Sequence, residues 1–370
     1  MKAFIRTTLL FLLIIAVGCG SSKNVQPTPA SVALMYVVGQ GANNIVGLAE
    51  KSTGELSSLG TPFTATNPRP VALALHPSKN FIYVANITSN TVSGFTVDHQ
   101  AGLLTPIGTA LPPTPVGSSP VSLGINSGGQ FLFVLNQGSA SISVFSIDAV
   151  RGILTEIVGS PFPTAVNPQS LAVSPNTGFL YVGNGALGTV SAFSIASSGA
   201  LSPVAGSPFT AGGSIAGVTI DPKDQFLFAA DSTGNKIVSF SIQASGALVP
   251  VAGSPFTTGT TPVSIAVDST SSFLYSANQG SSDVSGFKLS SGVLTQVSGS
   301  PYTTEATGVT TATKPAYVIV DVTNAFVYVG NSGTNAIAAF TMKSADGTLT
   351  TVTGSPFGQS VGPVWIVSTK

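Results

Sequence analysis

The chain has 370 residues, only 7% of them charged, and 13 Lys and Arg balance 13 Asp and Glu. Without a basic field to hold phosphate groups, the composition excludes a nucleic-acid-binding protein. The mean hydropathy is positive at +0.44, but the only long apolar run, Leu9–Val17, is too short to span a bilayer.

The N-terminus has the pattern of an export signal. Lys2 and Arg6 precede the apolar run, and small residues follow it. Ala16-Val17-Gly18-Cys19 resembles the bacterial lipobox, in which cleavage leaves the cysteine N-terminal and lipid-modified. We therefore predict a signal peptide over residues 1–18 and lipidation of Cys19.

Two further features favour a lipid anchor. Cys19 is the only cysteine, so it has no disulfide partner. The stretch that follows, within residues 19–32, is Ser/Pro-rich, as linkers are. The alternative is plain secretion with a chance cysteine. We expect an exported lipoprotein of the outer membrane or cell surface, and a location on the periplasmic side is the alternative. The lipid anchor is the one membrane contact that we expect.

A repeat of about 47 residues fills the rest of the chain. SGALSPVAGSPFT at 198–210 recurs as SGALVPVAGSPFT at 245–257. An aromatic residue within an apolar run marks the same place seven times: Tyr36, Tyr83, Phe133, Tyr181, Phe228, Tyr275 and Tyr328. A Gly-x-Leu turn also occurs seven times, from Gly54 to Gly347. The sequence therefore contains seven repeats.

Each repeat predicts four short strands separated by turns. In residues 261–302 the runs PVSIAVD, FLYSAN, DVSGFKL and VLTQVSG alternate with Gly-, Ser- and Asp-rich turns. Four antiparallel strands repeated at this period are typical of a β-propeller blade. We predict an all-β, seven-bladed propeller of four-stranded blades over residues 33–370.

The chain ends predict how the ring closes. The first repeat starts at its second strand, and GPVWIVSTK at 362–370 matches an inner strand with nothing after it. The C-terminal strand is therefore expected to complete blade 1 and remove the open edge. The Gly-Ser-Pro-Phe motif of several repeats is expected to end the outer strand and begin the crossing to the next blade. The Asn that follows most second strands is expected to bond its own turn.

The repeats resemble a known family. YVAN at 83–86, YVGN at 181–184 and VSGFTVDHQAGLL at 92–104 are similar to the seven-bladed lactonase superfamily, the 6-phosphogluconolactonase-like and YVTN-repeat propellers. The resemblance covers residues 33–370. It implies hydrolysis of a sugar lactone by polar residues on one face. Asn67-Pro68-Arg69-Pro70 matches the family's GPRH-type segment at Arg69, but Pro70 replaces the histidine.

Candidate site residues lie in segments predicted to share one face of the ring. Arg69, Glu305 and Lys314 precede inner strands and are the candidate catalytic residues. Asp231 and Asp283 lie beside turns between second and third strands and are candidate ligand-binding residues. The segment 301–314 is the longest of its kind, which favours function there.

Two large aromatic residues occupy matching inner-strand positions of neighbouring blades. They are Tyr317 in blade 7 and Trp365, the only tryptophan, in blade 1. Together they could stack a sugar ring or fill the channel as packing.

The two histidines, His76 and His99, are predicted in turns of the opposite face, with Asp98 beside His99. A weak transition-metal site is one interpretation and solvated turn residues the other. No cysteine and histidine ligand cluster or phosphate-binding glycine loop is present, so we predict no metal and no cofactor.

Two hypotheses follow. The first is a lipid-anchored, monomeric propeller that binds a carbohydrate or lactone ligand or a surface protein. The second is an exported sugar-lactone hydrolase that uses Arg69 with Glu305 or Lys314. Convergence of these three residues would favour the enzyme.

Overall fold

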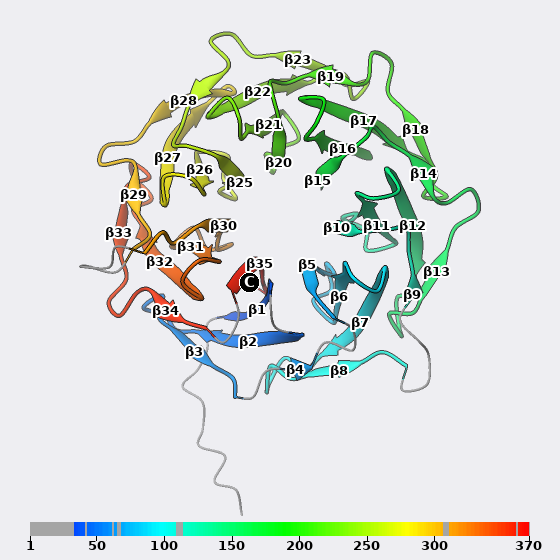
Figure 1. Ribbon diagram of the computed structural model, residues 1–370, viewed down its shortest axis with the longest axis horizontal. Helices are drawn as coiled ribbons and strands as arrows, with labels where there is room; N and C mark the ends of the chain where they lie inside the picture. Colours follow the sequence, from blue (N-terminus) through cyan, green and yellow to red (C-terminus); the bar gives the residue numbers. More distant parts are fainter. Residues whose placement is uncertain are drawn as a thin grey trace, which may run out of the picture. The chain divides into compact units, whose positions relative to one another are not determined.

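Seven β-sheets follow one another around a ring (Figure 1). The computed structural model describes residues 33–40, 43–60, 63–64, 68–108, 114–305, 311–359 and 362–369. This arrangement confirms the predicted seven-bladed all-β propeller. The predictions for residues 1–18, Cys19 and the linker lie outside the described residues. No helix in the described part is long and apolar enough to cross a bilayer.

The innermost strand of each blade borders the central channel. These strands are β5 (Pro70–Leu75), β10 (Pro120–Ile125), β15 (Pro168–Val173), β20 (Ile215–Ile220), β25 (Pro262–Val267), β30 (Pro315–Val320) and β35 (Gly362–Ser368). The second strands are β1 (Ala33–Gln40), β6 (Phe81–Asn86), β11 (Phe131–Asn136), β16 (Phe179–Asn184), β21 (Phe226–Asp231), β26 (Phe273–Asn278) and β31 (Phe326–Asn331).

The third strands lie further out and pair antiparallel with the second. They are β2 (Asn44–Glu50), β7 (Thr91–Val97), β12 (Ser141–Ile147), β17 (Thr189–Ile195), β22 (Lys236–Ile242), β27 (Asp283–Ser290) and β32 (Ala336–Met342). The outer strand begins as β3 (Leu56–Ser58), β8 (Leu104–Pro106), β13 (Leu154–Glu156), β18 (Leu201–Pro203), β23 (Leu248–Pro250), β28 (Val293–Gln296) and β33 (Leu349–Thr351).

The C-terminus closes the ring, as predicted. β35 pairs antiparallel with β1, with Trp365 opposite Val38 and Ile366 opposite Val37. Figure 1 shows the last strand beside the first one, inside blade 1. Closure gives blade 1 its inner strand and covers the edge of β1 that would otherwise lie open.

The outer strand is interrupted rather than ended by Gly-Ser-Pro-Phe, which corrects the sequence prediction. After the interruption a second short segment pairs with the third strand again. These segments are β4 (Phe63–Thr64), β9 (Thr114–Pro115), β14 (Phe162–Pro163), β19 (Phe209–Thr210), β24 (Phe256–Thr257), β29 (Tyr302–Thr303) and β34 (Phe357–Gly358). Each sheet therefore has five strand segments where the sequence suggested four.

The serine of the motif explains why the interruption is tolerated. In blade 5 the amide of Ser239 on β22 donates to the Ser254 hydroxyl at 2.9 Å. The equivalent bond from Ala192 to Ser207 is also 2.9 Å. The hydroxyl accepts where the broken strand offers no carbonyl, so the buried amide stays satisfied.

Neighbouring blades are joined by tyrosine hydroxyls. Tyr181 of blade 4 donates to the carbonyl of Gly246 in the Gly-x-Leu turn of blade 5 at 3.0 Å. The same bond joins four other pairs: Tyr36 to Gly102, Tyr83 to Gly152, Tyr275 to Gly347 and, across the seam, Tyr328 to Gly54. Burial raises the pKa of each of these tyrosines, so the hydroxyls stay protonated donors.

Blade 5 has Phe228 in place of the tyrosine and uses a different donor. Its Ser239, which lies opposite Phe228 in the sheet, donates to the carbonyl of Gly292 at 2.7 Å. The link between blades is thus kept although the residue type changes.

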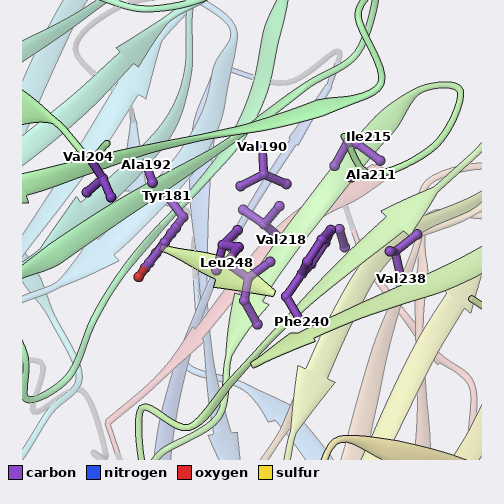
Figure 2. Close-up of a cluster of buried hydrophobic side chains, with 12 residues drawn as sticks. Tyr181, Val190, Ala192, Val204, Ala211, Ile215, Val218, Val238, Phe240 and Leu248 are labelled. Carbon is purple, nitrogen blue, oxygen red and sulfur yellow. The ribbon is translucent and has the colours of Figure 1, made fainter. Parts of the chain in front are cut away.

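The cores lie between blades, and Figure 2 shows one of them. Tyr181, Val190 and Ala192 of blade 4 pack with Ile215, Val218 and Phe240 of blade 5. Phe209, from the interrupted outer strand, packs against the same cluster. The aromatic residue of the motif therefore helps to fill the space between these two blades.

The glycine of the Gly-x-Leu turn meets a phenylalanine of the preceding blade. Gly246 has a φ of +82°, and a Cβ placed there would lie 2.5 Å from the Phe179 ring. Both the left-handed backbone and the close contact require glycine. Gly253, by contrast, has a φ of +84° and no atom closer than 3.8 Å to an added Cβ.

We predict that Gly246→Ala is more destabilising than Gly253→Ala. Both variants bear left-handed strain of about 1–3 kcal/mol, and Gly246→Ala adds overpacking against Phe179 of about 1–3 kcal/mol. Urea unfolding of both variants measures the difference. Equal destabilisation would show that the contact between blades contributes nothing.

Candidate functional site

One face of the ring carries the crossing loops, which lead from the outer strand of one blade into the inner strand of the next. The turns between second and third strands lie on the same face. The amide of Ile87 in such a turn donates to the Arg69 carbonyl at 3.1 Å, and that of Ser332 donates to the Lys314 carbonyl at 3.1 Å. Arg69 and Lys314 therefore lie on the same face as these turns, called here the crossing-loop face.

Arg69 and Lys314 occupy equivalent positions, each directly before the proline that starts an inner strand. Their φ angles are 57° and 49°, and both residues are exposed. Ser119, Asn167 and Thr261 have the same left-handed backbone at this position in other blades. The conformation therefore belongs to the repeat, whereas the two cationic side chains are particular to blades 2 and 7, which flank blade 1.

The structure does not join the three candidate catalytic residues. Glu305 is half-buried, and its amide donates to the Thr303 hydroxyl at 3.2 Å. Within the described residues no hydrogen bond or ion pair links Glu305 to Arg69 or Lys314. The ion pairs found there lie elsewhere: Lys51–Glu55, Arg151–Asp148 and Lys343–Asp346.

Asp231 and Asp283 hold turns in place. The Asp231 carboxylate accepts from the amides of Gly213, Ser214 and Gly234 at 2.9–3.1 Å, so it ties a crossing loop to its own turn. Asp283 accepts from the Asn278 side chain at 2.6 Å. Both carboxylates are already engaged by the fold.

The sequence suggested that the repeated asparagines bond their own turns, but in the structure they end the second strands and also bond other parts of the blade. The Asn184 side chain donates to the hydroxyls of Thr189 and Ser191 on the third strand, each at 3.0 Å. The Asn331 side chain donates to the Thr304 carbonyl near the end of the outer strand at 3.1 Å. This repeat position ties separate parts of a blade together.

The central channel contains a cavity of about 750 Å³ lined mainly by the inner strands. Its lining includes Tyr317 and Trp365, whose rings are stacked with centroids 4.6 Å apart and planes 23° apart. The two rings leave this cavity open, so they do not fill the channel completely. Tyr317 is its only ionisable lining side chain among the described residues.

The aromatic pair is anchored by the cores around blades 1 and 2. Tyr317 packs against the cluster between blades 7 and 1, and Trp365 packs against the clusters on both sides of blade 2. Burial raises the pKa of Tyr317, which keeps its hydroxyl protonated and unsuited to act as a base. The pair offers a flat, uncharged surface at the wall of the cavity.

On the opposite face, His76 is not the solvated turn residue that one sequence interpretation expected. It is 7% exposed, and its Nε2 lies 2.9 Å from the Gly129 carbonyl of blade 3. His99 is exposed, and its Nε2 lies 3.0 Å from Oδ1 of Asn80. No group of three or more His, Cys, Asp or Glu able to hold a metal ion is found among the described residues.

Buried carboxylates on that face also connect blades. Asp224 accepts from Ser174 and from the Asn176 amide of blade 4, at 2.8 and 2.6 Å. Asp221 accepts from Ser271 of blade 6 at 2.9 Å. Both aspartates are buried because turns of neighbouring blades meet there, which sequence position alone does not show.

The fold and the channel define a seven-bladed propeller with a ligand-sized, uncharged central cavity. The family model for the seven-bladed β-propeller lactonases matches residues 31–166, 160–252, 203–311 and 256–363. The chain therefore belongs to this lactonase family. No curated protein sequence gives a significant match.

Solved structures show the same fold at low sequence identity. A Bacteroides fragilis protein assigned provisionally as a 6-phosphogluconolactonase has a TM-score of 0.76 at 20% identity, covering 91% of this chain and 98% of its own. A periplasmic gluconolactonase of Pseudomonas aeruginosa has a TM-score of 0.72 at 16% identity, covering 91% and 98%. These likenesses concern the fold.

We predict that Asp231→Asn makes the free energy of unfolding less dependent on pH in the acid range. Burial raises the pKa of Asp231, but the backbone hydrogen bonds outweigh it and the pKa lies below its ordinary value. The ionised carboxylate therefore stabilises the fold fully above the ordinary pKa of about 4, and this contribution is lost as pH falls through the lower folded-state pKa.

The fold is expected to accept Asn at this position, because Asn stands there in blades 2, 3, 4, 6 and 7. At neutral pH it is expected to lose about 1 kcal/mol of unfolding free energy. Urea unfolding between about pH 5 and pH 2 should show the difference from the native protein shrinking. A difference in unfolding free energy that stays constant over this pH range would contradict the stabilising role of the ionised Asp231 carboxylate.

Proposed function

We propose that the protein binds an uncharged, oxygen-rich ring, a sugar or a sugar lactone, against the Tyr317–Trp365 pair in the central channel. The observation that carries this proposal is a stacked aromatic pair lining a cavity of about 750 Å³ that has no charged side chain in its described lining. Aromatic faces are suited to the apolar face of a sugar ring, and the remaining polarity comes from Gln169, Thr219, serines and the backbone of the strand edges.

Binding without hydrolysis fits the chemistry of the lining. Lactone hydrolysis needs a group that accepts a proton from the attacking water and one that returns a proton to the leaving oxygen. Tyr317 is held protonated, and Arg69, Glu305 and Lys314 are absent from the described cavity lining. The internal segments outside the described residues contain no Asp, Glu, His, Lys or Arg.

Hydrolysis of a sugar lactone is the second candidate function. Membership of the lactonase family favours it, and the exposed Arg69 on the crossing-loop face is the residue that matches the family segment. In this alternative Arg69 stabilises the developing negative charge of a bound lactone at the mouth of the channel.

The only tryptophan makes the first proposal directly measurable. Fluorescence of Trp365 is expected to change saturably on titration with D-glucono-1,5-lactone or methyl β-D-glucopyranoside. Tyr317→Ser, which installs the residue found in blades 3, 4 and 6, should weaken binding by up to about tenfold through the lost stacking. Tyr302→Phe, outside the channel, serves as the control.

Lactone turnover measured on the same samples separates the two candidates. We expect no hydrolysis of D-glucono-1,5-lactone or its 6-phosphate above the spontaneous rate. Turnover that disappears in Arg69→Ala would establish the second candidate and contradict binding without hydrolysis.

We further propose that the protein is exported and anchored by a lipid on Cys19, as a monomer at the outer membrane or cell surface. The lipobox-like Ala16–Cys19 segment and the single cysteine support this proposal. Cys19→Ser is expected to move the protein from the membrane fraction to the soluble fraction, with loss of labelling by radioactive palmitate. Unchanged membrane association would argue against the anchor.

A further inference from the structure

The inner strands present one free edge each to the channel. β5, β10, β15, β20, β25, β30 and β35 are the end strands of their sheets and pair on one side only. In an antiparallel pair, alternate residues point their amide and carbonyl groups away from the partner strand. These backbone groups therefore need water, a side chain or a ligand as partner.

At three junctions a serine of the preceding blade caps such an amide. Ser122 accepts from the Leu171 amide at 3.3 Å, Ser170 from Val218 at 3.3 Å and Ser264 from Val318 at 3.2 Å. The serines occupy one repeat position, and the amides belong to the next residue along in the following blade. These caps link blades 3 to 4, 4 to 5 and 6 to 7.

The other junctions lack this cap. The equivalent position is Tyr317 from blade 7 to 1, Trp365 from blade 1 to 2, and Ala72 from blade 2 to 3. None of these side chains has the short hydroxyl that accepts in the other blades. At the remaining junction, Gly217 allows a close approach, since a Cβ there would lie 2.7 Å from the Val263 carbonyl.

Three of the four uncapped junctions, those after Tyr317, Trp365 and Ala72, are consecutive and coincide with the aromatic pair. The amide opposite Trp365 in this repeat position is that of Leu73, and the amide opposite Ala72 is that of Leu123. Both residues line the same cavity as Tyr317 and Trp365. One wall of the channel combines the flat rings with backbone donors. The wall of blades 4 and 5 has its corresponding donors capped by serines.

We infer that the amides of Leu73 and Leu123 form a hydrogen-bond donor subsite that receives an oxygen of the ligand stacked on the Tyr317–Trp365 pair. This inference rests on the proposed function and deepens it. The ligand class it selects carries an acceptor oxygen, a ring oxygen or a lactone carbonyl, at the edge of a ring with an apolar face. Backbone donors are fixed by the sheet, so they bind such an oxygen without ordering a flexible side chain.

Ala72→Ser tests the subsite by supplying the missing cap. Serine already occupies this position in three blades, so the fold is expected to accept it. Its hydroxyl should compete for the Leu123 amide and weaken the binding of D-glucono-1,5-lactone, read from Trp365 fluorescence, by about threefold to tenfold. Ala149→Ser, the same change in an exposed turn outside the cavity lining, is the matched control and should leave the affinity unchanged.

Amide hydrogen exchange at single-residue resolution tests the same assignment without a ligand. The Leu123 amide of the native protein is expected to exchange faster than the capped Leu171 amide, and to slow in Ala72→Ser. Equal protection of Leu123 and Leu171 in the native protein would overturn the subsite. Native binding that Ala72→Ser leaves unchanged would overturn the subsite alone, whereas absence of binding by the native protein would overturn both the subsite and the proposed function.

Discussion

The propeller depends on a bond that each blade makes to the turn of the next. A buried hydroxyl on the second or third strand donates to the carbonyl of the Gly-x-Leu turn at six of the seven junctions in the described part. A typical bond of this kind contributes about 0.5–1.5 kcal/mol, and an orphaned partner costs more. Each junction also packs an apolar cluster, so stability builds up between blades rather than within them.

The same architecture explains why the channel can carry specificity. A ring built from one repeat would have identical walls. This chain departs from the serine of blades 3, 4 and 6 at one inner-strand position, which holds Tyr317, Trp365, Ala72 or, in blade 5, Gly217. The departures in blades 7, 1 and 2 are consecutive around the ring and include the closing strand, so they make one wall differ from the rest. Function is most readily placed where a repeat protein breaks its own pattern.

The charged residues described here lie outside the channel cavity. Asp221, Asp224 and Asp231 are largely buried and bound to backbone amides and hydroxyls of the turns and of neighbouring blades. Arg69 and Lys314 are exposed on the crossing-loop face, on either side of blade 1. These ionisable groups thus either stabilise the blades or lie exposed on the crossing-loop face. The described lining of the cavity has no charged side chain.

Local sequence determined the architecture of this protein. A period of about 47 residues, strand-length apolar runs and turn glycines suffice to predict seven blades and closure by the C-terminal strand, because each repeat folds from local pairing. It also predicted that Tyr317 and Trp365 share a repeat position. It could not show that the outer strand resumes after Gly-Ser-Pro, since the serine that replaces a carbonyl acts on a neighbouring strand. Nor could it show that His76 and the aspartates are buried, or which channel amides are capped. Those properties arise where two blades meet, and only the closed ring fixes which residues of one blade face the next.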